Sequence, residues 1–224
     1  MTKVAVVLSG CGVFDGSEIH EAVLTLLALD RAGCEVVCVA PDVPQREVVD
    51  HLTGKVTGET RNVRTESARI ARGKVEDVRD VRAGDFDAIA FPGGFGAAKN
   101  LCDFAAEGAS CTVEPGTAKL LGDALELGVP VALACIAPAV LAGVLRDRGE
   151  SAELTIGTDG ATGANLEAMG VVHVPCDVRT AHQDPSRPIV TTPAYMLARS
   201  VSETAAGIDA MVERLLAMVA RKNG

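Results

Sequence analysis

The sequence is poor in aromatic residues: it contains no tryptophan, one tyrosine and five phenylalanines among its 224 residues. Hydrophobic residues nevertheless make up 48% of the chain, so a core has to be built mainly from alanine, valine and leucine. Aliphatic strands of this kind are typical of a parallel sheet that is covered by helices on both faces. The composition therefore favours an α/β fold.

Positive charge is also scarce, because 30 aspartates and glutamates outnumber 21 lysines and arginines and leave a net charge of -9. Proteins that bind nucleic acid neutralise its phosphates with clustered basic side chains. We therefore expect no nucleic-acid partner.

The seven cysteines include no CxxC pair and no Cys/His ligand group. An odd number of scattered cysteines suits neither a disulfide framework nor a zinc site. We therefore expect reduced thiols in a reducing, cytoplasmic compartment, and no bound metal.

Motifs for nucleotide cofactors are missing as well. No Gly-Lys-Ser/Thr follows a glycine-rich stretch, which excludes a P-loop. The first loop, residues 9–16, is rich in glycine, but the dinucleotide fingerprint needs a glycine where the chain has Asp15, and Gly16 falls one position late. A nicotinamide site is the weaker interpretation, and we expect no cofactor.

Long apolar runs are absent too. The uncharged stretch at 128–145 is divided by Pro130 and Pro138 into strand and helix lengths, whereas a spanning helix needs about 20 apolar residues. The apolar run at 4–8 is too short for the core of a signal peptide. These lengths predict a protein that does not cross a membrane.

Short apolar runs alternate with helical patterns along the whole chain, which predicts βαβ units in one doubly wound domain over residues 1–224. The pattern predicts parallel neighbouring strands at 4–8, 35–40, 86–91 and 131–134. Three further strands are expected at 152–156, 171–174 and 188–192. Helices are expected at 17–32, 114–127, 139–145 and 196–219, with an irregular charged region at 51–73.

Cys135 follows the apolar run 129–134 and precedes Pro138, which opens a helical pattern. This order predicts a strand, a sharp turn and a helix, with the cysteine above the carboxyl end of the sheet. The amino end of the helix favours the thiolate, so we expect the pKa of Cys135 to lie below the free value of about 8.5. A buried structural cysteine is the alternative.

Glu18 lies in the first turn of the first expected helix. It is either a carboxylate at the helix start, with Ser17 as the cap, or an acid/base group that shares a proton with Cys135. His20 is offset by two positions and is expected to point away from Glu18. Gly93 follows the third of the four neighbouring strands. Its backbone amide is one of those that could donate a hydrogen bond to an oxyanion.

Five segments resemble the ThiJ/PfpI superfamily, and in particular its ElbB branch. They read Leu-Ser-Gly-Cys-Gly (8–12), Asp-Gly-Ser-Glu-Ile-His-Glu (15–21), Pro-Gly-Gly-Phe-Gly-Ala-Ala-Lys-Asn (92–100), Cys-Ile-Ala-Pro-Ala (135–139) and Thr-Thr-Pro-Ala-Tyr-Met (191–196). The resemblance runs from about residue 3 to residue 220. Members of this branch carry the names isoprenoid-biosynthesis protein, enhancing-lycopene-biosynthesis protein and glyoxalase.

The resemblance implies a flavodoxin-like three-layer sandwich and a glyoxalase that needs neither glutathione nor metal. Its substrate would be glyoxal or methylglyoxal, and its product a 2-hydroxy acid. Cys135 would be the nucleophile, with Glu18 beside it. The remaining expected site residues are the oxyanion and substrate-binding residues Gly93, Gly94, Ile136, Gly10 and Cys11, and two weaker candidates, His20 and Asn100.

The sequence departs from the wider superfamily at the general base. Many members have a histidine directly after the nucleophile, where this chain has Ile136, and residues 155–159 contain no histidine either. We therefore expect slow turnover.

Two other functions remain open. A glutamine amidohydrolase would need a histidine and a glutamate near the last strand, and residues 191–195 contain neither. A thiol redox sensor or a metabolite-binding module is the non-enzymatic alternative. For each of these functions we expect a homodimer.

Overall fold

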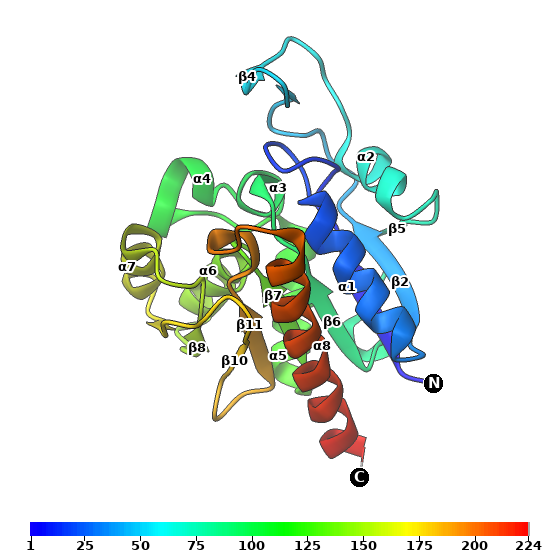
Figure 1. Ribbon diagram of the computed structural model, residues 1–224, viewed down its shortest axis with the longest axis vertical. Coiled ribbons are helices and arrows are strands. Elements are labelled where there is room, and N and C mark those ends of the chain that lie inside the picture. The colour runs from blue at the N-terminus through cyan, green and yellow to red at the C-terminus, as the bar shows by residue number, and fades with distance from the viewer. Residues whose placement is uncertain (224) are drawn as a thin grey trace.

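The central sheet contains seven strands in the computed structural model, which describes residues 1–223 (Figure 1). Their order across the sheet is β10-β11-β7-β6-β1-β2-β5. The strands are β1 (Lys3–Val7), β2 (Glu35–Ala40), β5 (Glu76–Asp77), β6 (Ala88–Phe91), β7 (Val131–Ala134), β10 (His182–Gln183) and β11 (Ile189–Thr192). Neighbours pair in parallel, except that β10 runs antiparallel to β11 at one edge.

The strand pairing confirms the predicted parallel core. β1 pairs with β2 and with β6, and β6 pairs with β7. The five main strands follow the order β2-β1-β6-β7-β11, which is the flavodoxin-like order of a doubly wound sheet. The order reverses between β1 and β6, and ligands of such folds bind beyond the carboxyl ends of the strands at this switch point.

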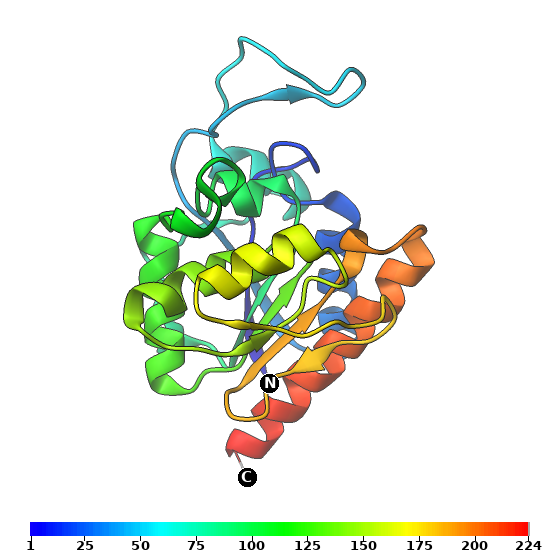
Figure 2. The same ribbon diagram turned by 90° about the vertical axis from the view of Figure 1, so that its left-hand side faces the viewer.

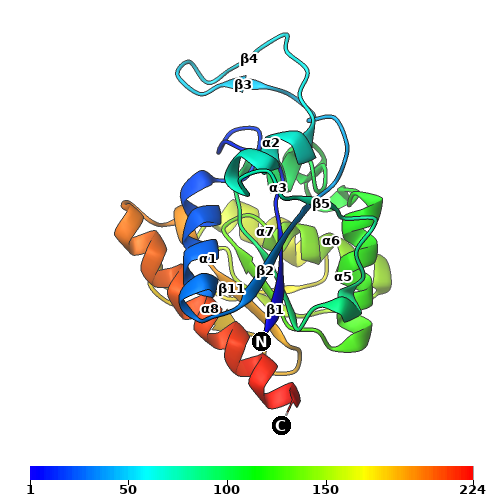
Figure 3. The same cartoon turned by 90° about the vertical axis from the view of Figure 1, so that its right-hand side faces the viewer.

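Helices cover both faces of the sheet (Figures 1 and 3). One face carries α1 (Ile19–Arg31), α2 (Val63–Ile70) and α8 (Val201–Asn223). The other face carries α3 (Phe95–Lys99), α5 (Pro115–Leu127), α6 (Pro138–Arg148) and α7 (Gly160–Ala168), with α4 (Phe104–Glu107) beside α3. The three-layer sandwich is therefore confirmed.

The alternation of side chains along β1 explains why both layers form. Ala5 and Val7 pack into the core under α5 and α6, whereas Val4 and Val6 pack into the core under α1 and α8. These side chains are at most 1% exposed. A strand that is apolar at every position is buried on both faces, as parallel sheets require.

The region 51–73, expected to be irregular, contains regular structure. A hairpin of β3 (Val49–Asp50) and β4 (Lys55–Val56) projects away from the sheet, and α2 follows it (Figure 2). The side chain of Asn62 caps α2 by accepting the amide of Thr65 at 2.9 Å. The prediction was wrong here because α2 is short and polar. Its stability depends more on the cap than on an apolar stripe, and an apolar stripe is the pattern by which a helix is recognised in a sequence.

The region after α6 also differs from the prediction. The strands expected at 152–156 and 171–174 shrink to β8 (Glu153–Leu154) and β9 (Val172–His173), which form a separate small sheet with α7 between them. The last helix begins at Val201 rather than near 196, because Ala194–Met196 forms the 3-10 turn η3. Two other 3-10 turns are η1 (Ala83–Asp85) and η2 (Gly108–Ser110).

None of the helices in the described part of the chain combines the length and the apolar character needed to cross a membrane.

Candidate active site

Cys135 lies at the carboxyl end of β7, on a sharp turn that leads into α6. Its φ is 59°, a left-handed conformation that is uncommon for residues other than glycine. Its amide donates to the carbonyl oxygen of Thr192 at 2.9 Å, which ties the turn to the end of β11. Strained residues of this kind cluster at functional sites. The predicted strand, turn and helix around Cys135 are therefore present.

Glu21, rather than Glu18, is the carboxyl group that contacts the sulfur of Cys135. The side chain of Glu21 is fully buried and shares a hydrogen bond with the thiol. Its Oε2 accepts the amide of Gly93 at 2.9 Å, and its Oε1 accepts the amide of Tyr195 at 3.0 Å. Desolvation outweighs these hydrogen bonds and raises the pKa of Glu21 to about 7.

Glu18 is the N-cap of α1. Its Oε2 accepts the amide of Glu21 at 2.7 Å, while the hydroxyl of Ser17, the expected cap, accepts the amide of Ser9 at 2.8 Å. The prediction that Glu18 shares a proton with Cys135 is wrong, because its carboxylate turns back to the start of the helix. Its side chain, 12% exposed, instead lines the cavity beside the cysteine.

Two backbone amides, those of Gly94 and Ile136, donate to the sulfur of Cys135. The structure thus brings together the two amides that the sequence assigned to an oxyanion site, and that role stays a prediction. Gly93 differs from this expectation, because its amide is engaged with Glu21. A Cβ on Gly93 would lie 2.4 Å from the Cβ of Cys135, so glycine is required for this close approach.

The expected acidity of the Cys135 thiol is contradicted. Burial and the nearby carboxylate of Glu21 raise the pKa of Cys135 well above its ordinary value, although the amides of Gly94 and Ile136 oppose that shift. The sequence argument considered the helix dipole and omitted desolvation, which dominates for a side chain that is 8% exposed. The thiol and the carboxyl therefore form a buried pair in which ionisation of either group disfavours ionisation of the other.

His20 lies nearer to the site than expected. Its Nδ1 is 2.8 Å from the hydroxyl of Tyr195 and 4.0 Å from Oε1 of Glu18. Tyr195 is placed by Ala194, whose φ is 44°. His20 was expected to point away from Glu18, but the turn at Ala194 carries Tyr195 over this end of α1, a contact that helical spacing alone does not reveal.

A cavity of about 400 Å³ opens beside Cys135. It lies at the carboxyl edge of the sheet, where the loops after β1, β6, β7 and β11 meet. Its walls are formed by Val13, Glu18, Gly94, Phe95, Ala98, Phe104, Ala105, Cys135, Ile136, Thr162, Tyr195 and Met196. A cavity of this size is within the range of small-molecule sites.

Gly10 and Cys11 do not belong to the walls of this cavity, so their expected substrate contact stays a prediction that the cavity does not support. The amide of Gly10 donates to the hydroxyl of Ser67 at 2.9 Å, which turns this part of the first loop toward α2. Burial and the nearby Glu66 raise the pKa of the Cys11 thiol. The first loop reaches the cavity through Val13 instead.

Asn100 also has a different place from the one expected. Its Nδ2 donates to the carbonyl oxygens of Ser9 and Asp15, both at 2.8 Å, and its Oδ1 accepts the amide of Arg46 at 3.0 Å. Asn100 therefore holds the first loop against the chain that leads to the hairpin, and does not line the cavity.

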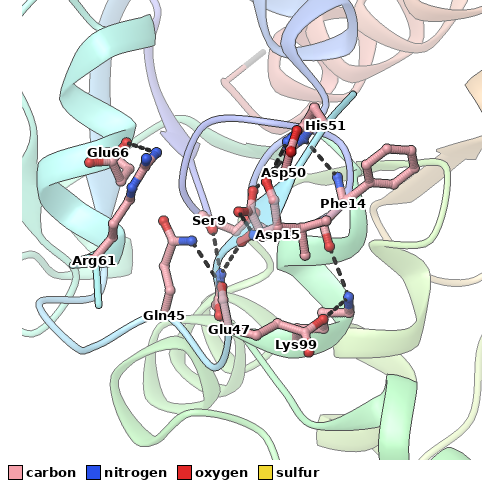
Figure 4. A network of polar contacts seen from close by, with 12 residues as sticks. Ser9, Phe14, Asp15, Gln45, Glu47, Asp50, His51, Arg61, Glu66 and Lys99 are labelled. Atoms are coloured by element: carbon pink, nitrogen blue, oxygen red, sulfur yellow. Dashed lines mark hydrogen bonds and ion pairs between the residues drawn. The ribbon is translucent and has the colours of Figure 1, made fainter. Parts of the chain in front are cut away.

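Other contacts extend this loop clamp, which we define as Asn100, Asp15, His51, Lys99 and Glu47. Oδ2 of Asp15 accepts the amide of Val49 at 2.8 Å, and its Oδ1 is 3.9 Å from Nε2 of His51. Lys99 pairs with Glu47. Figure 4 shows Asp15, His51, Lys99 and Glu47 of the loop clamp around the first loop, with Arg61 against Glu66 at one side. The loop clamp fixes the first loop against the segment that leads to the hairpin.

The described residues include no group of three or more His, Cys, Asp or Glu side chains arranged to hold a metal ion.

Sequence reasoning missed Glu21, although a signal for it existed. The buried residues of α1 are Glu21, Ala22, Thr25, Ala28 and Leu29, which recur at the spacing of one helix face. A glutamate on the buried face of an otherwise apolar stripe has to be hydrogen-bonded or neutral. That rule would have favoured Glu21 over Glu18 as the partner of a buried thiol.

The flavodoxin-like sheet and the cysteine on its elbow define a class of α/β proteins with a buried thiol–carboxyl pair. The model of the DJ-1/PfpI family matches residues 3–173. The chain belongs to the DJ-1/PfpI family, which confirms the family assignment made from the motifs.

Similar proteins cover nearly the whole chain. The human glutamine amidotransferase-like class 1 domain-containing protein 3, mitochondrial, is 44% identical and covers 98% of this chain and 84% of its own length. The zebrafish ES1 protein, mitochondrial, is 31% identical over 87% of this chain and 77% of its own. The crystal structure of an isoprenoid biosynthesis protein with an amidotransferase-like domain from Ehrlichia chaffeensis has a TM-score of 0.91, 36% identity, and covers 98% of this chain and 100% of its own.

These names correct one expectation. The curated relatives from human, rat and zebrafish are all named mitochondrial proteins, which contradicts the cytoplasmic location inferred from the unpaired cysteines. Reduced thiols indicate a reducing environment but do not distinguish one such compartment from another.

Proposed function

We propose that the chain, as one domain, is a cofactor-independent glyoxalase-type enzyme that converts a 2-oxoaldehyde to a 2-hydroxy acid through Cys135. The observation that carries the proposal is the buried pair of Cys135 and Glu21, with the amides of Gly94 and Ile136 donating to the same sulfur. A carboxyl group with a pKa of about 7 is suited to accept and return a proton near neutral pH.

The first step would join the sulfur to the aldehyde carbon. Glu21 accepts the thiol proton as Sγ of Cys135 bonds to that carbon, and the carbonyl oxygen becomes an oxyanion. The amides of Gly94 and Ile136, which donate to the sulfur, would stabilise this oxyanion. Return of the proton to that oxygen gives a hemithioacetal.

The second step would move a proton between two carbons. Glu18 lines the cavity and removes the proton from the carbon that bears the sulfur, which gives an enediol. Return of this proton to the neighbouring carbon leaves a thioester, and water then releases the 2-hydroxy acid and restores the thiol. Tyr195, held by His20 at 2.8 Å, faces the same cavity and would orient the second carbonyl oxygen.

Glutamine hydrolysis is less well supported, although the human relative is named a glutamine amidotransferase-like protein. In the described part of the chain, the groups that donate to or accept from the sulfur are Glu21 and two amides, with no histidine among them. His20 is engaged elsewhere, because its Nδ1 is 2.8 Å from the hydroxyl of Tyr195.

The test is turnover of glyoxal and methylglyoxal by the wild type, Cys135→Ala, Glu21→Gln and Glu18→Gln. We expect Cys135→Ala to be inactive, and each glutamine variant to lose about 100-fold or more in kcat, as for a lost acid/base group. Cys11→Ala is the matched control, because this thiol lies outside the cavity. Equal activity in the wild type and Cys135→Ala would reject the proposal, and ammonia release from glutamine would favour the amidohydrolase.

We also propose a homodimer through the outer face of α1. Ile19, Val23 and Leu27 follow one another at helical spacing and are 43%, 46% and 38% exposed. An exposed apolar stripe on a helix is typical of a protein–protein contact. Val23→Asp is expected to shift the protein to a monomer in analytical ultracentrifugation, and Asp30→Ala, on an exposed polar position of the same helix, to leave its mass unchanged.

A further inference from the structure

Three of the six aromatic side chains of the protein line the cavity beside Cys135: Phe95, Phe104 and Tyr195. Phe86 and Phe91, by contrast, are at most 7% exposed and belong to the core. Phe95 is 47% exposed, so its ring is not occupied by core packing. Aromatic surface left open in a concave site is the kind that an apolar ligand covers.

The remaining walls of the cavity are mostly carbon. The aliphatic contributors are Val13, Ala98, Ala105, Ile136 and Met196. Glu18 is the one wall residue, among those the structure describes, whose side chain carries a formal charge at neutral pH. Most of this cavity therefore offers dispersion contacts rather than hydrogen bonds.

The polar groups of the site are concentrated in one connected cluster. The hydroxyl of Tyr195 contacts His20 at 2.8 Å, and His20 is 4.0 Å from Glu18. The amide of Tyr195 donates to Glu21, which contacts Cys135. A ligand placed with its reacting carbonyl group at this cluster would direct its other end along the apolar walls.

The cavity is much larger than glyoxal. Its volume of about 400 Å³ corresponds to more than ten water molecules at ~30 Å³ each, whereas glyoxal has only two carbons. A two-carbon dialdehyde would leave the aromatic walls uncovered.

We infer that this site binds carbonyl compounds that carry an apolar substituent, such as a phenyl group or a hexyl chain. For its chemistry, the inference rests on the proposed function. With that function, the substrate is a 2-oxoaldehyde that carries the apolar substituent. The carbonyl carbon lies at Cys135, and the substituent packs between Phe95, Phe104 and Met196. The reaction itself is unchanged: the 2-oxoaldehyde and one water give the 2-hydroxy acid.

Binding separates this inference from the catalytic proposal. Titration calorimetry of the wild type with the methyl ketones acetone, 2-pentanone and 2-octanone measures affinity for a neutral carbonyl compound without any turnover. The dissociation constant is expected to fall about fourfold per added methylene while the chain remains in the cavity. Affinities that do not rise with chain length, or no binding by 2-octanone, would overturn the inference.

Two alanines of α4 provide matched variants. Ala105 lines the cavity and Ala106 does not, and both are exposed, so a larger side chain is compatible with folding at either position. The ratio of the affinities for 2-octanone and acetone measures the gain from the longer chain. Ala105→Phe is expected to reduce this ratio by at least about tenfold, because the new ring fills the space for the chain. Ala106→Phe should retain the full gain. Equal behaviour of the two variants would place the apolar ligand elsewhere and overturn the inference.

Turnover completes the comparison. The value of kcat/KM is expected to rise about 100-fold or more from methylglyoxal to 2-oxooctanal in the wild type. Chain-dependent ketone binding without turnover of either aldehyde would reject the glyoxalase chemistry and retain the apolar site. Turnover of both aldehydes with equal kcat/KM would retain the chemistry and reject the inferred substrate class.

Discussion

Glu21 and Asp15 are two buried carboxyl groups on either side of the start of α1, and their surroundings are opposite in kind. Asp15, in the loop clamp, accepts the amide of Val49 and has His51 at 3.9 Å. In the described structure, Glu21 accepts hydrogen bonds from two amides and contacts a thiol, all of them neutral donors. Burial and the nearby Glu18 raise the pKa of Glu21, so its carboxyl group is able to exchange a proton near neutral pH, which is what general acid/base chemistry needs.

The two regions also differ in what their backbone does. The loop clamp uses side chains to satisfy carbonyl oxygens and amides of a glycine-rich loop, which stabilises it. The active site contains two of the strained residues, Cys135 and Ala194, with φ of 59° and 44°. The loop clamp satisfies the polar groups of a glycine-rich loop, whereas the cavity side keeps two residues other than glycine in left-handed conformations.

Outside the reacting side chains, the largest effect is expected from Gly93→Ala. A Cβ at this position would lie 2.4 Å from the Cβ of Cys135 and 2.7 Å from Oε2 of Glu21, so both groups have to shift. A displacement of about 1 Å lowers activity by roughly 100-fold. Kinetics with methylglyoxal and urea unfolding check this, with Gly58→Ala as the control because a Cβ there meets no atom within 4 Å. Full activity of Gly93→Ala would mean that the pair is less tightly placed than described.

A second prediction concerns the pH dependence of stability. The pKa of Glu21 rises from 4.5 in the unfolded chain to about 7 in the folded one, so the folded state binds more protons between these values. The contribution of Glu21 to the free energy of unfolding is therefore fully present below pH 4.5 and is lost as the pH rises through about 7. The total loss is roughly 3 kcal/mol.

Urea unfolding of the wild type and Glu21→Gln across pH 4 to 8 measures this difference. The stability of the wild type relative to the variant should fall over that interval, since glutamine does not ionise. Glu18→Gln should retain most of the wild-type slope, because burial is the main cause of the raised pKa of Glu21 and the charge of Glu18 only adds to it. Parallel curves for the wild type and Glu21→Gln would show that Glu21 ionises as freely in the folded protein as in the unfolded chain.

The smallest effect is expected on the loop clamp side. Asn100→Ala leaves the carbonyl oxygens of Ser9 and Asp15 and the amide of Arg46 without their partner. Unfolding free energy is expected to fall by about 2 kcal/mol. Asn165→Ala, which removes an exposed contact on α7, serves as the control. If Asn100→Ala instead lost activity at unchanged stability, the division between loop clamp and site would be wrong.

The sheet and the elbow were predictable because each depends on a local pattern. Continuous apolar runs predicted β1, β2, β6 and β7, and a proline shortly after Cys135 predicted the turn into α6. α2 and the hairpin lack such patterns, because their structure depends on a cap and on contacts with the first loop.

The carboxyl partner of Cys135 was not predicted correctly, for a different reason. Glu18 and Glu21 are three residues apart, and either could be placed near the elbow from the motif alone. The choice depends on which one lies on the buried face of α1 and which one caps it. The acidity of Cys135 was mispredicted for a related reason, because burial becomes visible only when all layers are assembled.

The hydrogen bond from the amide of Tyr195 to Glu21 joins residues 174 positions apart. Glu21 lies on α1, and Tyr195 lies in the turn that precedes α8. Local unfolding of that turn would admit water to Glu21 and bring the pKa of its carboxyl group back towards that of a free glutamate. The ability of Glu21 to exchange a proton near neutral pH therefore depends on a contact with a segment far away in the sequence.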